Sequence, residues 1–104
     1  MTRQDLAPGY QLVQSVHSAF DFSLEFPEVT KDWNTQSNYL ACLSTEDEAS
    51  LFILISKLKA RGIKHTVFRE PDIDNQVTAV AIAPGEISRK LTSNYPLALK
   101  NIMI

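Results

Sequence analysis

Gln14 and His17 are the residues whose types and spacing first suggest chemistry. They are three positions apart in a stretch with helical periodicity, so both side chains are expected on one edge of the same helix. A histidine imidazole titrates near neutral pH and can act as a general base. The plainer interpretations are that His17 makes a hydrogen bond within the fold and that Gln14 ties its helix to a loop.

A second group of candidates follows the strand expected at residues 63–68. Glu70, Asp72 and Asp74 lie in a turn-rich loop, and Thr78 lies in the next expected strand. Glu70 or Asp72 could orient a histidine or take a proton itself, and the hydroxyl of Thr78 could donate to an oxyanion. The structural alternatives are a solvated acidic turn and a threonine placed for its strand propensity.

The sequence contains no pattern typical of a cofactor or metal site. Its two histidines and its one cysteine lie far apart, without the spacing of metal ligands. It also lacks a phosphate-binding glycine loop and a nucleophile elbow. We therefore expect no cofactor and no metal.

The composition is that of one ordinary folded domain, expected to span residues 1–104. The chain has 44% hydrophobic residues and a formal net charge of −2, which argues against a general nucleic-acid binder. Cys42 lies in the apolar run 39–43 and is expected to be a small buried residue. A single cysteine, with no apparent signal peptide or membrane span, favours the cytoplasm and no membrane association. Whether the basic residues of 57–64 and 89–100 meet in space is left open.

The first third of the chain is expected to hold a strand stub at 1–6 and a helix at 8–26. Pro8 suits the first helical turn, and Leu12, Val16 and Phe20 recur at helical spacing, which predicts an apolar stripe pressed onto a sheet. Pro27 is expected to end this helix, and a short second helix at 30–35 is weakly indicated.

The remaining elements predict alternation of strands and helices. They are a buried strand at 39–43, a helix from the capping box of Thr45 and Glu48 to Gly62, a hairpin of strands 63–68 and 76–83, a helix at 86–92, and an apolar tail at 95–99 that packs back onto the sheet. The expected core stripe of the middle helix is Leu51, Leu54, Ile55 and Leu58. This order predicts an α/β fold with a mixed four-stranded sheet, a truncated first strand and helices on both faces.

With these residues placed, the sequence resembles the type II peptidyl-tRNA hydrolase family, the archaeal and eukaryotic type that also has divergent bacterial members. One segment of likeness is Asp5-Leu6, Gly9 and the Gln-x-x-His run of 14–17. Another is the strand Thr78-Ala79-Val80-Ala81-Ile82-Ala83-Pro84, and the helix end Lys59-Ala60-Arg61-Gly62-Ile63 is also typical. The order and spacing of these segments cover nearly the whole chain.

The resemblance implies hydrolysis of the ester between a peptide and the 3′ ribose of tRNA. It implies a peptidyl-tRNA or related RNA partner, and the family tends to form homodimers. Carried onto this sequence, the expected catalytic residues are His17, Glu70, Asp72 and Thr78. The expected substrate-binding residues are Gly9, Tyr10, Gln14 and Arg69.

Two departures from the family pattern keep a second interpretation open. The loop Ala7-Pro8-Gly9-Tyr10-Gln11 lacks the lysine that the family places there, and the loop after the strand at 63–68 is shorter than the family's Asp-Ala-Gly turn. The alternative function is a catalytically silent relative that binds RNA or a protein partner as a homodimeric domain.

Overall fold

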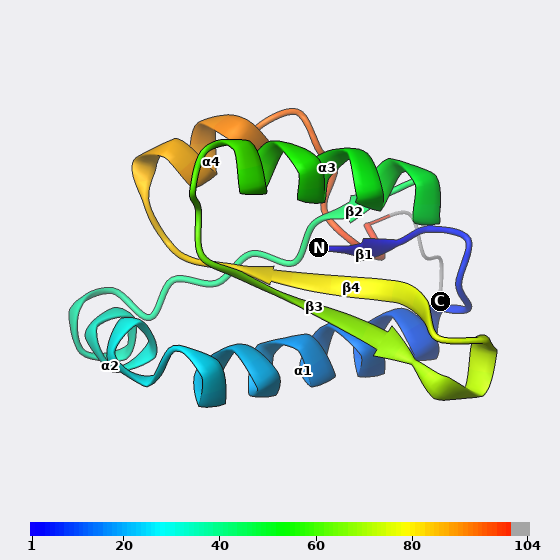
Figure 1. Ribbon diagram of the computed structural model, residues 1–104, viewed down its shortest axis with the longest axis horizontal. Coiled ribbons are helices and arrows are strands. Elements are labelled where there is room, and N and C mark those ends of the chain that lie inside the picture. Colours follow the sequence, from blue (N-terminus) through cyan, green and yellow to red (C-terminus); the bar gives the residue numbers. More distant parts are fainter. Residues whose placement is uncertain (101–104) are drawn as a thin grey trace.

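A mixed four-stranded sheet with helices on both faces forms the framework of the computed structural model, which describes residues 1–100 (Figure 1). In chain order the elements are β1 (Thr2–Arg3), α1 (Pro8–Glu25), α2 (Pro27–Gln36), β2 (Ser44–Thr45), α3 (Glu48–Ala60), β3 (His65–Glu70), the short 3-10 helix η1 (Pro71–Ile73), β4 (Gln76–Ile82) and α4 (Glu86–Thr92).

The strand order is β2-β1-β4-β3. β1 runs parallel to β2 and antiparallel to β4, and β3 and β4 form the expected antiparallel hairpin. α1 and α2 lie on one side of the sheet, and α3 and α4 lie on the other (Figure 1). The predicted α/β class and mixed four-stranded sheet are confirmed, and β1 is only two residues long. No helix within residues 1–100 is long and apolar enough to cross a bilayer.

The main apolar core lies between the sheet and α3. Leu51, Leu54 and Leu58 are fully buried there and pack with Val77 and Val80 of β4. The predicted stripe of α3 is therefore confirmed, because its residues recur every three or four positions and face one way.

The C-terminal end of α3 is as predicted from the sequence, and its N-terminal cap is not. Gly62, just past the helix, has a φ of 64°, the left-handed conformation that glycine adopts without strain. At the start, the predicted capping box is wrong. Asp47 is the N-cap and accepts from the N–H of Ser50, while the carboxylate of Glu48 accepts from the N–H of Val77 on β4.

The buried face of α1 is polar, and the predicted apolar stripe is wrong. The buried residues are Gln11, Gln14, Ser18 and Phe22, whereas Phe20 is 67% exposed and Leu12 is 58% exposed. The reason lies in the sheet, whose α1 face presents Thr66, Glu70 and Thr78. Buried polar groups require hydrogen-bond partners, and only a polar helix face supplies them. Tertiary pairing has overridden the hydrophobic periodicity of the helix.

The strand predicted at 39–43 and the burial of Cys42 are also wrong. Tyr39 and Leu40 are more than 70% exposed, Cys42 is exposed, and β2 begins only at Ser44. This segment runs along the rim of the sheet, where the C-terminal tail pairs with it. Ala98 donates to the carbonyl of Cys42 across a bridge between residues 43 and 97. The predicted return of the tail is confirmed at this edge.

The other element bounds differ by a few residues from those expected. α2 spans 27–36 rather than 30–35, because Pro27 both follows the end of α1 and opens the next helix. β3 lies two residues later than predicted, and β4 ends one residue earlier. The hairpin and α4 are as predicted.

The inverted packing of α1 predicts opposite results for two phenylalanines on the same helix. Phe22→Ala should lower the free energy of unfolding by about 3 kcal/mol, since it empties a buried site. Phe20→Ala should change it by less than about 0.5 kcal/mol, since that ring is already exposed to water. Urea unfolding measures both. Equal losses would contradict the orientation of α1.

Candidate functional site

A buried chain of hydrogen bonds joins α1 to both strands of the hairpin. The hydroxyl of Thr78 donates to Oε1 of Gln14, and Nε2 of Gln14 donates to Oε1 of Glu70 at 2.9 Å. Gln14 and Thr78 are fully buried, and Glu70 is 9% exposed. The structure thus brings together three of the residues that the sequence had nominated.

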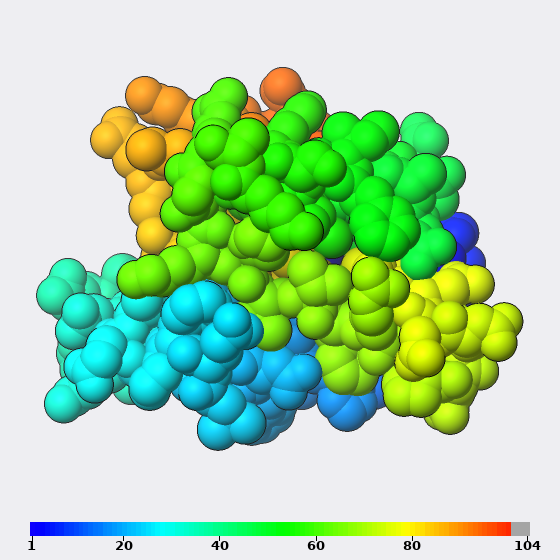
Figure 2. All heavy atoms as spheres, in the orientation of Figure 1, coloured from blue at the N-terminus to red at the C-terminus, as the bar shows by residue number. Residues whose placement is uncertain are grey.

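Strand alternation and one β-bulge position these side chains. Thr66 donates to Glu25 and the ring of Phe68 stacks on His17, so alternate residues of β3 face α1, and Glu70 continues this row. Between Phe68 and Arg69 the register of the hairpin slips, and Thr78 is the extra residue on β4. Bulges of this kind re-aim a side chain, and here the bulged threonine meets Gln14. Figure 2 shows the side chains of β3 filling the seam between α3 and α1.

His17 lies at the exposed side of this network. Its ring stacks on Phe68 with a centroid separation of 4.6 Å and an angle of 2° between the planes. His17 thus lies one helical turn from Gln14 on α1, as the spacing in the sequence predicted. Gln14 reaches Glu70 and His17 reaches Phe68, two residues before it on the same face of β3, so the charge of His17 acts on the carboxylate that Gln14 holds.

The environment of Glu70 favours its ionised form. The hydrogen bond from Gln14 lowers the pKa of the carboxyl most, and the N–H of Asp72 lowers it further. Burial opposes this shift, while Tyr10 and the charge of His17 support it. Glu70 is consequently a fixed negative charge near neutral pH, suited to orienting a proton acceptor more than to serving as one.

Tyr10, one of the expected substrate-binding residues, lies in the first turn of α1. Burial raises the pKa of its phenol, and the negative charges of Glu70 and Asp72 raise it further. The phenol therefore keeps its proton and is a hydrogen-bond donor beside Glu70. Gly9, in the first turn of the same helix, is exposed, and a Cβ added there would contact nothing within 4 Å.

The turn that leads into α1 depends on residues that sequence reasoning did not identify. Arg3 is buried and donates through two nitrogens to the carboxylate of Asp5, at 2.9 and 2.8 Å. It also donates to the side chain of Gln76 and to the carbonyl of Val77. Gln11 donates to the carbonyl of Leu6 at 2.7 Å. The available signal was a pair of opposite charges two residues apart, Arg3 at the end of β1 and Asp5 in the turn that follows.

Two nominated residues lie away from the network. Arg69 points to the opposite face of the sheet, where its guanidinium lies 5.9 Å from the ring centroid of Phe52 on α3 and donates to the carbonyl of Asn75. Asp72 reaches Glu70 through its backbone N–H, and the residue is exposed. The structure does not bring either side chain into the hydrogen-bonded chain.

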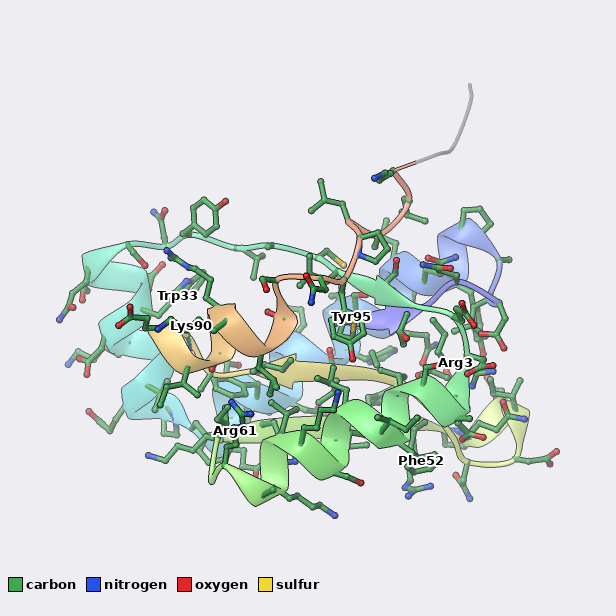
Figure 3. The ribbon with its side chains drawn as sticks, turned by 90° about the horizontal axis from the view of Figure 1, so that it is seen from above. Arg3, Trp33, Phe52, Arg61, Lys90 and Tyr95 are labelled. Carbon is green, nitrogen blue, oxygen red and sulfur yellow. The ribbon has the colours of Figure 1, made fainter. Side chains whose placement is uncertain are left out.

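Charge is unevenly distributed along the strand direction, with Arg3 and Arg69 at the more acidic end and Glu25 and Glu86 at the more basic end. One end of the sheet carries the acidic residues of 46–48 and 70–74 together with Asp5. At this end α3 starts, β3 ends and α1 begins, and it also holds the candidate site. The basic residues of 57–64 and 89–90 lie at the other end, roughly 20 Å away along β3. Figures 1 and 3 place α4, which carries Lys90, beside the end of α3 that leads to Arg61. Both basic groups are remote from Glu70.

The candidate site is a surface site. Two surface cavities in the described part of the chain are lined by other residues and contain neither His17 nor Glu70. Among residues 1–100, no group of three or more histidine, cysteine or carboxylate side chains is arranged to hold a metal ion. A substrate would have to approach across the exposed side of His17 and Tyr10.

Comparison with known proteins gives no family assignment. No protein-family model matches this chain, and no curated protein matches it.

The lowered pKa of Glu70 predicts a specific acid sensitivity. A carboxyl with a depressed folded-state pKa contributes stability above its unfolded value of about 4.3, and this contribution is lost as the pH falls through the folded-state pKa. Glu70→Gln has no titrating group there, so the stability difference between the two proteins should shrink below about pH 4.3. Urea unfolding from pH 7 to pH 3 measures it. A difference that is constant with pH would contradict the ionised, hydrogen-bonded Glu70.

Proposed function

We propose that this protein hydrolyses the ester that joins a peptide to the 3′ end of tRNA, with His17 and Glu70 at the centre of the site. The proposal rests chiefly on one observation, the buried Thr78–Gln14–Glu70 chain beside His17. The likeness of the sequence to type II peptidyl-tRNA hydrolases names the substrate.

In the proposed mechanism, His17 accepts a proton from a water molecule whose oxygen attacks the ester carbonyl carbon. The bond from that carbon to the ribose 3′ oxygen then breaks, and the proton passes to the departing oxygen. Stacking on Phe68 orients the imidazole, and the negative charge of Glu70 stabilises its charged form. Gln14 and Thr78 act as positioning residues, because they fix the carboxylate of Glu70 and are themselves buried.

The oxyanion of the tetrahedral intermediate needs hydrogen-bond donors. Tyr10 offers a protonated phenol, and the first turn of α1 offers backbone N–H groups at residues 9 and 10 that have no partner within the helix. Tyr10 brings these donors close to Glu70, because its phenol interacts with the carboxylate of Glu70. In this proposal Tyr10 takes the place of the lysine that the family has in this loop.

The enzymatic proposal predicts which substitutions abolish turnover. Release of the peptide from a model peptidyl-tRNA, measured with enzyme in excess, should slow by about 100-fold or more in His17→Ala and in Glu70→Gln. Asp72→Asn should stay within about threefold of wild type, since only its backbone contacts Glu70.

His65→Ala is the matched control, because the ring of His65 bonds to the carbonyl of Ile63 at the far end of β3. It should retain the wild-type rate. Circular dichroism would verify that each variant is folded. The enzymatic proposal fails if folded wild-type protein gives no release above the uncatalysed rate.

The uneven distribution of charge favours a second candidate, a catalytically silent domain that binds a partner as a homodimer. The candidate site lies at the acidic end of the molecule, whereas RNA backbones are held by Lys and Arg. Apolar residues of α1 are also exposed, among them Val13, Phe20 and Leu24. Light scattering that shows a dimer, together with an inert His17 site, would support this candidate.

A further inference from the structure

The strand that carries the candidate site is an edge strand of the sheet. β3 is the last strand in the order β2-β1-β4-β3, so within the described part of the chain it pairs with β4 on one side only. Its other side faces outward along the seam between α1 and α3, where side chains of β3 reach the surface (Figure 2). His17 stacks on Phe68 and Gln14 binds Glu70, so the proposed site lies at one end of this edge.

The outer edge of β3 carries unpaired main-chain groups. Residues of an antiparallel strand address their two neighbours alternately. The N–H of Ala83 donates to the carbonyl of Lys64, so every second residue from Lys64 to Phe68 addresses β4. The N–H and carbonyl groups of His65 and Val67 therefore point outward, and none of these four groups has a hydrogen-bond partner within residues 1–100.

The surroundings of this edge suit a further strand. Proteins commonly protect an exposed edge with prolines or charged side chains, and the middle of β3, Thr66-Val67-Phe68, contains neither. Val13 and Leu24 lie four positions before and seven after His17, so they share its side of α1, and they are 49% and 80% exposed. On the other face, Phe52 of α3 packs beside a β3 side chain and is 41% exposed. An extended chain added here would bury apolar side chains on both faces.

The position of His17 decides which extended chain fits and in which direction it runs. The proposed substrate carries a peptide whose C-terminal acyl carbon has to reach the imidazole. His17 lies over Phe68, toward the C-terminal end of β3. A peptide parallel to β3 brings its own C-terminal end to this point, whereas an antiparallel peptide would direct that end toward His65 and away from the imidazole.

We propose that the peptide arm of the substrate binds as an additional strand parallel to β3, an inference that rests on the proposed function. The peptide residue that carries the ester, here the first residue, donates its N–H to the carbonyl of Val67. The N–H of Val67 donates to the carbonyl of the third residue, and the N–H of the second residue points away from β3. This register places the first residue level with Phe68, so that its acyl carbon lies beside His17. Because the bonds involve main-chain groups, they hold peptides of varied sequence.

Methylation of single peptide nitrogens tests the register. The substrates are model peptidyl-tRNAs with an acetylated trialanine arm, and each enzymatic rate is divided by the uncatalysed rate of the same substrate. N-methylation of the first residue should lower kcat/KM about fivefold or more, whereas N-methylation of the second residue should change it by less than about twofold. Equal effects at the two positions, or a loss confined to the second residue, would overturn the proposal.

Two substitutions at Val67 separate its main chain from its side chain. Val67→Pro and Val67→Ala both remove the valine side chain, but only proline removes the outward N–H, and it leaves the bonds to β4 in place. The advantage of a three-residue arm over an acetylated one-residue arm should be about fivefold smaller in Val67→Pro than in Val67→Ala. Equal advantages in the two folded variants would overturn the proposal. The methylation series uses the wild-type protein, so it decides the question even if Val67→Pro does not fold.

The outcomes distinguish this inference from the proposed function. Release that is fast but independent of arm length and of methylation would overturn strand addition and leave the hydrolase proposal standing. The absence of release from every substrate would overturn both. Light scattering that shows a dimer, with the N–H of Val67 already protected from hydrogen exchange without substrate, would also overturn the inference, because a second copy would then occupy the edge of β3.

Discussion

The amide of Gln14 is the group on which the arrangement of this protein depends. It is fully buried, it donates to Glu70, and it accepts from Thr78, so one side chain joins α1 to both strands of the hairpin. An unsatisfied buried amide or carboxylate costs about 1–3 kcal/mol, so the three groups stabilise the fold only as a set. This constraint fixes the rotation of α1 against the sheet.

The rotation of α1 has consequences on both of its sides. With its polar face against the sheet, His17 comes to lie over Phe68 at the acidic end of the molecule. The apolar residues that would otherwise be buried turn outward, and Leu12 and Val16 line an apolar groove. The candidate catalytic site and this groove are thus two results of the same helix orientation.

The sequence predicted those features that depend on local pattern. The stripe of α3, the left-handed Gly62, the hairpin and α4 follow from periodicity and turn chemistry, and the structure confirms them. The face of α1 was predicted wrongly, because the hydrophobic pattern carries no information about a polar sheet face whose partners of Gln14 lie 56 and 64 residues later. The buried strand predicted at residues 39–43 was wrong for a related reason, since an apolar run at the rim of a sheet has the same pattern as a buried strand.

The candidate site was predictable in part. The spacing of Gln14 and His17 placed them on one helix edge. Glu70 was expected in a loop, whereas it is the last residue of β3 and its side chain accepts from Gln14. The bulge at Thr78 and the clamp of Arg3 on Asp5 arise from tertiary pairing, which sequence spacing does not specify. Arg69 faces away from α1 because successive residues of a strand point to opposite faces of the sheet. This could be inferred only once Glu70 was known to face α1.

The central claim is that Gln14 acts on catalysis only by holding Glu70 beside His17. A double-mutant cycle of peptidyl-tRNA cleavage rates, with Gln14→Met, Glu70→Gln and the double variant, tests it most directly. The account predicts that each single variant is slow and that the double variant is no slower than Glu70→Gln alone. Losses that multiply in the double variant, or a Gln14→Met protein that is folded and as fast as wild type, would contradict it.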